Sequence, residues 1–158
     1  MIDDVVKIAR RSTHKRYLTG AIIFNRQGET LSKGWSHTGF KMYNLLSVHA
    51  EMHCLWRARH LDLSGCSIYI ITIAGKSGNL TTGKPCLNCA IALQAAGVET
   101  LFYSLPGGDI SGPNFIEDEL DNLKDYSIEN NYGKNSWQPP KWAIPKRKRA
   151  FRDDGLQS

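Results

Sequence analysis

Hydrophobic and polar positions in the first third of the chain follow one helical pattern and two strand patterns. In residues 2–12 apolar side chains recur at helical spacing after two aspartates, which predicts a helix. The segment TGAIIFN, residues 19–25, is rich in β-branched residues, and TLSKGW, residues 30–35, alternates as a strand does. The short loop between them predicts a β-hairpin. Residues 36–46 have no regular period and predict a loop.

The middle of the chain alternates between helical and strand patterns. Residues 48–61 predict an amphipathic helix, and the continuous β-type run of residues 65–74 predicts a strand buried on both faces. Residues 75–84, GKSGNLTTGK, predict a loop. Residues 86–97 predict a helix that starts after a proline and stops at a glycine, and residues 98–104 a further strand. This order is typical of an α/β sandwich with a partly parallel sheet.

The last third of the chain has a weaker pattern. A short helix is predicted near residues 114–123, followed by a segment rich in proline and basic residues. We therefore interpret residues 1–135 as one domain and residues 136–158 as a Pro-rich basic strap or tail. A length of 158 residues suits a single domain with a real core.

Composition narrows the class of protein. A hydrophobic content of 41% and a charged content of 22% are ordinary for a globular protein. No apolar run approaches the ~18 residues needed to cross a bilayer, and the acidic start lacks the layout of a secretion signal. We therefore expect a cytoplasmic protein with no membrane partner. Its four cysteines are then expected to be thiols or metal ligands rather than disulfides.

Charge is distributed unevenly within the net value of +5. Residues 1–108 hold twelve Lys or Arg against six Asp or Glu, residues 109–140 two against seven, and residues 141–158 six against two. A basic body and a basic tail indicate an anionic ligand, a nucleotide or a nucleic acid. The tail, with Trp137, Trp142 and Phe151 in or beside it, is similar to single-strand binding segments. The alternative is a solvated tail, with the acidic stretch folded back on the basic body.

Two predicted helix starts carry the residues that indicate chemistry. One offers His49 and Glu51, and the other offers Cys86 and Cys89 three positions apart, so that both sulfurs face the same way. One histidine and two cysteines give Zn²⁺ three protein ligands and leave a fourth position for water. Glu51 is then a carboxylate able to accept a proton from that water. Ala50 leaves its backbone N–H available to a ligand.

The pattern His-Ala-Glu followed by Pro-Cys-x-x-Cys resembles the zinc-dependent cytidine and deoxycytidylate deaminase superfamily. The likeness extends over about residues 20–104. It implies a three-layer sandwich with a mixed five-stranded sheet between helices, a Zn²⁺ cofactor held by His49, Cys86 and Cys89, and Glu51 as the catalytic proton shuttle. Relatives that act on free nucleotides usually assemble, so a homo-oligomer is expected.

The resemblance also implies where the substrate binds. The Ala50 N–H would hold the base carbonyl, Pro85 stands beside the metal ligands, and Tyr103 and Ser104 end a strand near which substrates lie in this superfamily. Two features depart from the family pattern. Ser36 and His37 stand near the place where deoxycytidylate deaminases usually carry an asparagine, and residues 75–84 form an inserted loop. Further candidates for phosphate or base contacts are His14, Lys76, Lys84, Phe40 and Tyr43.

Three other interpretations of the metal motif were weighed. A structural zinc would need a fourth ligand such as Cys54, His53 or Cys66, and helix phase opposes Cys54. A zinc protease would need glutamate at the position that Ala50 occupies. A redox Cys-x-x-Cys pair leaves His49 and Glu51 unexplained. The catalytic interpretation is preferred.

The predicted function is hydrolytic deamination of a cytosine-type nucleotide, similar to deoxycytidine monophosphate (dCMP), to its uracil counterpart with release of ammonia. The first alternative is a deaminase of single-stranded DNA or RNA, favoured by the basic body and tail. The second is a non-catalytic module that binds nucleotide or nucleic acid and whose zinc is structural. The motif activates water without specifying the ring, so purine substrates remain open.

Overall fold

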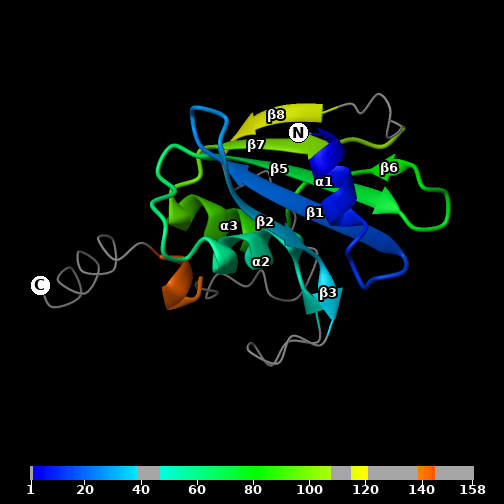
Figure 1. Ribbon diagram of the computed structural model, residues 1–158, viewed down its shortest axis with the longest axis horizontal. Coiled ribbons are helices and arrows are strands. Elements are labelled where there is room, and N and C mark those ends of the chain that lie inside the picture. Colours follow the sequence, from blue (N-terminus) through cyan, green and yellow to red (C-terminus); the bar gives the residue numbers. More distant parts are fainter. Residues whose placement is uncertain (1, 39–46, 108–114, 121–138, 145–158) are drawn as a thin grey trace, which may run out of the picture.

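The computed structural model describes residues 2–38, 47–107, 115–120 and 139–144 (Figure 1). Phe40, Tyr43, Trp137 and the expected boundary at residue 135 lie outside these ranges, as do residues 145–158. The helices are α1 (Ile2–Ala9), α2 (Ala50–Arg57), α3 (Leu87–Ala96) and the 3₁₀ helix η3 (Lys141–Ala143). The strands are β1 (Tyr17–Phe24), β2 (Thr30–Trp35), β3 (His37–Thr38), β4 (Ser47–Val48), β5 (Ser67–Ala74), β6 (Leu80–Thr81), β7 (Thr100–Ser104) and β8 (Phe115–Glu119).

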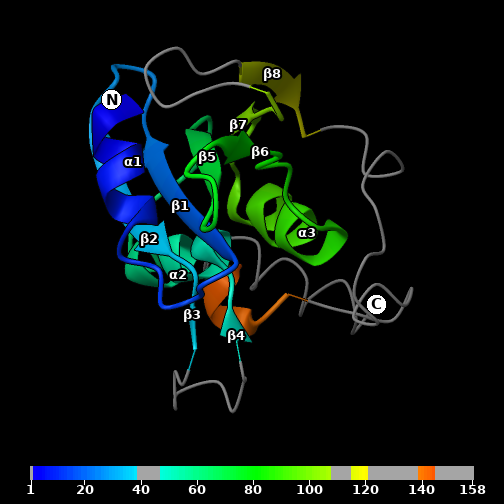
Figure 2. The same ribbon diagram turned by 90° about the vertical axis from the view of Figure 1, so that its right-hand side faces the viewer.

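The central sheet is mixed, with the strand order β2-β1-β5-β7-β8 and with β6 paired to β5 beside this path. β5 and β7 run parallel, whereas the other pairs in the sheet are antiparallel. Helix α1 covers one face of the sheet, and α2 and α3 cover the other (Figure 2). This arrangement confirms the predicted three-layer α/β sandwich.

The C-terminal part of the sheet corrects one prediction. The short helix expected near residues 114–123 is wrong, because residues 115–119 form β8, which pairs antiparallel with β7 from Phe115–Ser104 to Glu119–Thr100. Local helix preference in this acidic segment is overridden by the backbone hydrogen bonds that the edge of β7 offers. Short strands also occupy parts of two predicted loops, namely β3 within residues 36–46 and β6 within residues 75–84.

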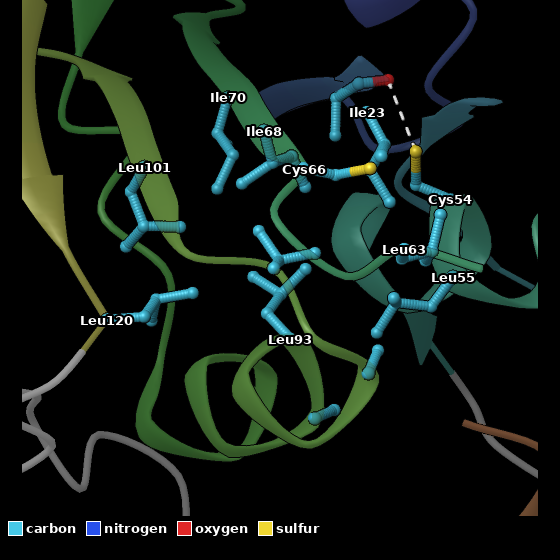
Figure 3. Close-up of a cluster of buried hydrophobic side chains, with 14 of the residues drawn as sticks. Ile23, Cys54, Leu55, Leu63, Cys66, Ile68, Ile70, Leu93, Leu101 and Leu120 are labelled. Atoms are coloured by element: carbon cyan, nitrogen blue, oxygen red, sulfur yellow. Dashed lines mark hydrogen bonds between the residues drawn. The ribbon is translucent and has the colours of Figure 1, made fainter. Parts of the chain in front are cut away.

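The larger hydrophobic core lies between the sheet and the helices α2 and α3 (Figure 3). Ile68 and Ile70 of β5 meet Leu93 of α3 there, and Leu101 of β7 lies in the same core. Cys54 and Cys66 are buried among these side chains, as the sequence predicts for small apolar residues. Each fully buried aliphatic side chain of this size contributes roughly 1.5–3 kcal/mol to folding.

The smaller core lies under α1, on the other face of the sheet. Val5 and Ile8 of α1 pack with Ile71 and Ile73 of β5. Alternate residues of β5 therefore enter different cores, and this confirms the predicted strand with two buried faces. Because both cores share β5, the helices on the two faces are tied to one central strand.

Helix α2 lies unusually close to β2 at Gly34. A Cβ atom on Gly34 would stand 2.5 Å from the carbonyl oxygen of Ala50, far inside van der Waals contact. Only glycine permits this approach. The contact fixes the first turn of α2 against the sheet, and that turn carries the residues of the predicted site.

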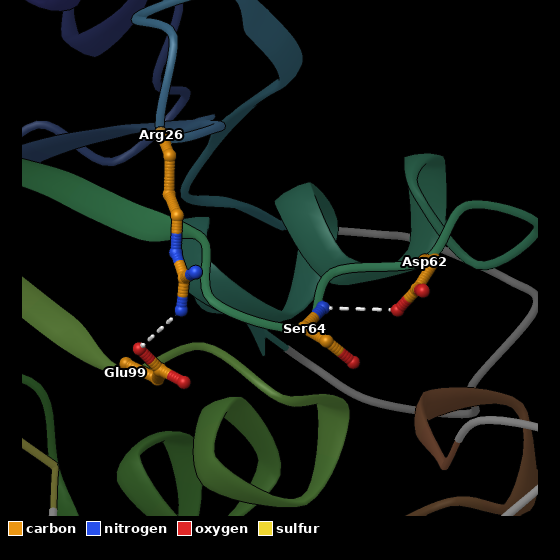
Figure 4. A network of polar contacts seen from close by, with 4 residues as sticks. All are labelled: Arg26, Asp62, Ser64 and Glu99. Atoms are coloured by element: carbon orange, nitrogen blue, oxygen red, sulfur yellow. Dashed lines mark hydrogen bonds and ion pairs between the residues drawn. The ribbon is translucent and has the colours of Figure 1, made fainter.

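Two further features lie away from that turn. Trp142 in η3 packs against the larger core and meets the Trp56 ring edge-on, with centroids 5.1 Å apart. At another surface (Figure 4), exposed Arg26 and Glu99 form an ion pair of 3.4 Å, a kind of contact worth little in water. No helix in the described ranges is both long and apolar enough to cross a membrane.

Candidate metal centre and active site

The starts of α2 and α3 meet at one point. His49 is the N-cap of α2 and Cys86 the N-cap of α3, both with extended backbone angles. Their carbonyl oxygens accept the first helical hydrogen bonds, from the N–H groups of His53 and Ala90. Neither side chain caps its own helix. Both are therefore available to hold a ligand between the helices.

Three donor atoms lie close together at this point. The Nδ1 atom of His49 is 3.7 Å from the Sγ of Cys86 and 3.4 Å from the Sγ of Cys89. Zinc bonds of about 2.3 Å to sulfur and about 2.0 Å to nitrogen, at tetrahedral angles, require a nitrogen–sulfur separation of about 3.5 Å. The observed distances bracket this value. His49, Cys86 and Cys89 therefore fit a zinc ion as they stand.

The alternative fourth ligands are occupied elsewhere. Cys54 lies in the larger core and points at the Ala21 carbonyl oxygen, at 3.8 Å, and Cys66 is buried in the same core. His53 accepts a hydrogen bond at Nδ1 from the Trp35 N–H, at 3.2 Å. Within the described ranges, the metal-binding group contains three residues. It has the composition expected of an open rather than a closed zinc site.

Glu51 lies beside this group on the first turn of α2. A regular helix would place it about 200° from His49, on the opposite side. His49 is the extended N-cap, however, so this separation does not apply, and both residues line one cavity. The side chain is buried, and the loss of water around it raises the pKa of the Glu51 carboxyl. A raised pKa suits a carboxylate that must accept a proton and release it again.

The three metal-binding side chains influence one another strongly. The hydrogen bond with Cys86 raises the pKa of His49 to about 9. The hydrogen bond from Cys89 lowers the pKa of Cys86 to about 4, and His49 adds to this effect. The Cys89 thiol has its pKa raised, because it donates to Cys86 and is buried. A metal ion must therefore displace protons from Cys89 and His49 when it binds.

A cavity of about 530 Å³ opens beside the metal-binding group. At one end its wall includes His49, Ala50, Glu51 and Cys86. The rest of the lining consists mainly of hydroxyl and basic side chains, namely His14, Arg16, Tyr17, Thr19, Ser36, Thr72, Thr81, Thr82, Gly83 and Lys84. Among the described residues of this lining, Glu51 is the only carboxylate, so this part of the cavity suits an anionic, polar ligand.

The residues predicted to bind substrate occupy different places. Ala50 and Ser36 line the cavity, and the Ser36 hydroxyl accepts a hydrogen bond from the Thr19 N–H at 3.2 Å. His37 is buried against His53, with ring centroids 4.7 Å apart, outside the lining. Pro85 is also buried outside it. Neither of these two residues is among those that line the cavity.

The two candidates on β7 lie deeper. Tyr103 is part of the larger core, and Ser104 is completely buried, so neither lines the cavity. Residues that sequence reasoning missed take their place, among them Arg16, Thr19 and Thr72. The sequence does mark Thr19 and Thr72, because each is a polar residue in a predicted strand made largely of apolar residues. His14 and Lys84, named as candidates, do line the cavity.

Comparison with known proteins agrees with this geometry. The sequence profile of the cytidine and deoxycytidylate deaminase zinc-binding region matches residues 1–105. The chain belongs to this family. As a member of this zinc-binding family it has Zn²⁺ as its expected metal, and His49, Cys86 and Cys89 can form the site. No curated protein sequence matches the chain at a significant level.

Solved structures show the same fold as this family member. A cytidine deaminase from Burkholderia pseudomallei is similar with a TM-score of 0.58 and 14% identity, over 80% of this chain and 95% of that one. The dCMP deaminase of cyanophage S-TIM5 is similar in its apo form, with a TM-score of 0.51 and 22% identity, over 63% of this chain and 75% of that one. The phage enzyme in complex with dCMP and dUMP gives 0.50 and 21%, over 63% and 74%.

Proposed function

We propose that this family member is a hydrolytic deaminase that converts a cytosine-type nucleotide, dCMP or a close relative, to its uracil counterpart and releases ammonia. The observation that supports this most directly is the position of a buried carboxylate, Glu51, beside one imidazole nitrogen and two cysteine sulfurs at one end of a polar cavity. The carboxylate and the metal-binding group are both needed for hydrolysis, and a structural zinc would need only the latter.

The metal-binding residues have a simple role in this proposal. His49, Cys86 and Cys89 would hold Zn²⁺, and the distances from the His49 nitrogen to the two sulfur atoms match those between ligands of a tetrahedral zinc ion. When bound, the ion activates water toward the ring carbon that carries the amino group. The N-terminus of α3, where Cys86 is the N-cap, favours the thiolate form of Cys86. The rigid caps of α2 and α3 keep the three donors in place while the substrate changes.

Glu51 carries the protons. Its carboxylate accepts one proton from the attacking water and delivers it to the ring nitrogen next to the reacting carbon. It then transfers the second proton of that water to the amino group, which leaves as ammonia, and the ring carbon keeps the oxygen. The carboxylate is deprotonated again at the end of the cycle. The net reaction converts water and the amino-bearing base to ammonia and the carbonyl-bearing base. Burial raises the pKa of the carboxyl, which suits a group that must accept a proton and release it again.

The remainder of the cavity is assigned to the nucleotide. The Ala50 N–H belongs to the first turn of α2, where helical N–H groups have no partner within the helix, and it is assigned to the base carbonyl. Hydroxyl groups such as Ser36 suit a sugar. Arg16 and Lys84 supply the positive charge that a phosphate needs, and His14, whose pKa is lowered by burial and by His49 and His37, adds a hydrogen-bonding group. Residues 145–158, which hold most of the basic side chains of the tail, lie outside the described residues, and single-stranded DNA is therefore included in the test.

The test presents zinc-loaded protein with dCMP, deoxycytidine triphosphate, cytidine, adenosine monophosphate and single-stranded DNA, and follows release of ammonia and the replacement of an amine by a carbonyl by mass spectrometry. We expect turnover of dCMP. The Glu51→Gln variant should keep one zinc per chain and lose about 10²- to 10⁴-fold in kcat, the size of a general acid–base contribution. Cys86→Ala should lose both zinc and turnover. Full activity of Glu51→Gln would refute the assigned role.

A further inference from the structure

The inserted segment between β5 and α3 forms one wall of the cavity. Its strand β6 pairs with the C-terminal end of β5, with Thr81 opposite Thr72 and Leu80 opposite Ile73. Thr72 is in turn opposite Thr19 of β1, and their hydroxyls are 2.9 Å apart. Three threonines from β1, β5 and β6 therefore stand in one row, and all three line the cavity.

Basic residues that also line the cavity come from the segments before β1 and after β6, the two outer strands of this threonine row. His14 and Arg16 come from the connection between α1 and β1, next to Thr19. Lys84 comes from the segment that follows β6, next to Thr81. The threonine hydroxyls, together with the cations Arg16 and Lys84, are suited to a phosphate monoester, which accepts hydrogen bonds and carries up to two negative charges.

Ser104 connects β6 and the segment after it to β5 and β7 through three hydrogen bonds. Its hydroxyl donates to the Thr81 carbonyl oxygen at 2.7 Å and accepts from the Thr72 N–H at 3.1 Å. Its own carbonyl oxygen accepts from the Gly83 N–H at 2.8 Å. Ser104 is 0% exposed, so these bonds are shielded from water and their loss would leave buried groups unpaired.

At Gly83 the segment Leu80–Lys84, which we call the wall, packs directly against the sheet. A Cβ atom on this residue would lie 2.6 Å from the carbonyl oxygen of Ile70 and 3.0 Å from the Ser104 hydroxyl. Any side chain there must push the segment away from the sheet. Leu80, just before this stretch, is buried in the smaller core. The wall is thus fixed at Leu80, Thr81 and Gly83, directly before Lys84.

We infer that Ser104 is a positioning residue that holds the wall Leu80–Lys84 in place, and that this wall makes the enzyme select a phosphorylated nucleotide over the corresponding nucleoside. The inference rests on the proposed function and adds residues to it that act at the phosphate rather than at the base. Ser104 does not line the cavity and acts on the ligand through the position of Lys84. Its loss should therefore weaken nucleotide binding without changing the chemical step.

The test compares dCMP with deoxycytidine in zinc-loaded, full-length protein. Ser104→Ala should raise KM for dCMP about tenfold, because displaced Lys84 would lose one hydrogen bond to the charged phosphate. The kcat should stay within about twofold of wild type. Both constants for deoxycytidine should be unchanged. Gly83→Ala should act in the same direction, because it displaces the same wall by a different cause. Ser77→Ala, in the same segment but at an exposed turn, is the matched control and should match wild type.

A double variant separates positioning from a general structural defect. Lys84→Met alone should raise KM for dCMP at least as much as Ser104→Ala, and Ser104→Ala combined with Lys84→Met should be no worse than Lys84→Met. Additive effects, equal losses for dCMP and deoxycytidine, or a change in kcat alone would overturn the inference. If wild type deaminates no cytosine substrate, the proposed function fails. The same variants are then compared by calorimetric binding of dUMP, where unchanged affinity, or no binding by wild type, would also overturn the inference.

Discussion

His53 lies one helical turn after the metal-binding His49 but faces a different environment. It is buried against His37 and the Trp35 ring, whose centroids are 4.7 and 4.4 Å from its own. Burial lowers the pKa of His53 to about 4, with smaller contributions from His37 and Arg57. The imidazole is therefore neutral in the folded protein over a pH range where an exposed histidine takes up a proton.

This difference predicts a loss of stability in mild acid. In the unfolded chain His53 binds a proton below about pH 6.5, whereas in the folded protein it stays neutral down to about pH 4. The free energy of unfolding should therefore fall as the pH is lowered from 6.5, by about 2 kcal/mol at pH 5. His53→Asn can still accept from the Trp35 N–H and should remove this part of the slope in denaturant titrations of zinc-loaded protein. His60→Asn, at an exposed histidine, should retain the wild-type slope.

At the scale of residues, the sequence predicted the metal-binding group and the place of Glu51 beside it, but only part of the lining of the cavity. His49, Glu51, Cys86 and Cys89 are close together because each stands at a helix start, and helix starts have recognisable signals. Ser104 was chosen because it ends a strand, yet it faces the interior and bonds to Thr81. Which side of a strand end faces a cavity depends on neighbouring strands, and no local pattern records that.

At the scale of elements, the position of α2 depends on its contact with β2. The first turn of this helix carries His49, Ala50 and Glu51, and it rests on Gly34, where a Cβ would lie 2.5 Å from the Ala50 carbonyl oxygen. Gly34→Ala should therefore shift the start of α2. We expect a loss of about 1–3 kcal/mol in stability, as in other overpacked sites, together with weaker zinc binding and lower kcat.

The Gly34 prediction is measured by thermal unfolding and by titration of zinc against a chromophoric chelator. Lys33→Ala is the matched control, because Lys33 is the exposed neighbour of Gly34 on β2. It should leave both zinc affinity and kcat unchanged. If Gly34→Ala lost stability but kept full zinc affinity and kcat, the helix start would be positioned by other contacts, and our explanation of the site geometry would be wrong.

Elements themselves were predictable to different degrees. The hairpin β1–β2, strand β5 and helix α3 have long, regular patterns and were predicted close to their observed bounds. β8 was mistaken for a helix because its five residues are stabilised by β7, a strand more than ten positions earlier in the chain. β6 was predicted as part of a loop for the same reason, since it consists of two residues paired to β5. Short elements are determined by their partners rather than by their own composition.

At the scale of the whole molecule, the C-terminal region divides into two parts whose contributions truncation can separate. Residues 139–144 belong to the packed body, because Trp142 contacts Trp56 and the larger core, and Ala143 and Ile144 are buried. The residues after 144 include five Lys or Arg and two Asp. Stability should therefore depend on the first part, and any affinity for nucleic acid on the second.

Two shortened chains test this division. A chain ending at Asn135 loses the packing of Trp142 and Ile144 and should be less stable by roughly 2–4 kcal/mol, measured by denaturant titration. A chain ending at Ile144 should keep wild-type stability and wild-type turnover of dCMP. If the protein also acts on single-stranded DNA through its tail, this second chain should bind DNA more weakly and with a shallower dependence on salt, because fewer counterions are released. Unchanged DNA affinity and salt dependence would show that the basic tail is not a nucleic-acid surface, and would leave the cavity as the place where the substrate is chosen.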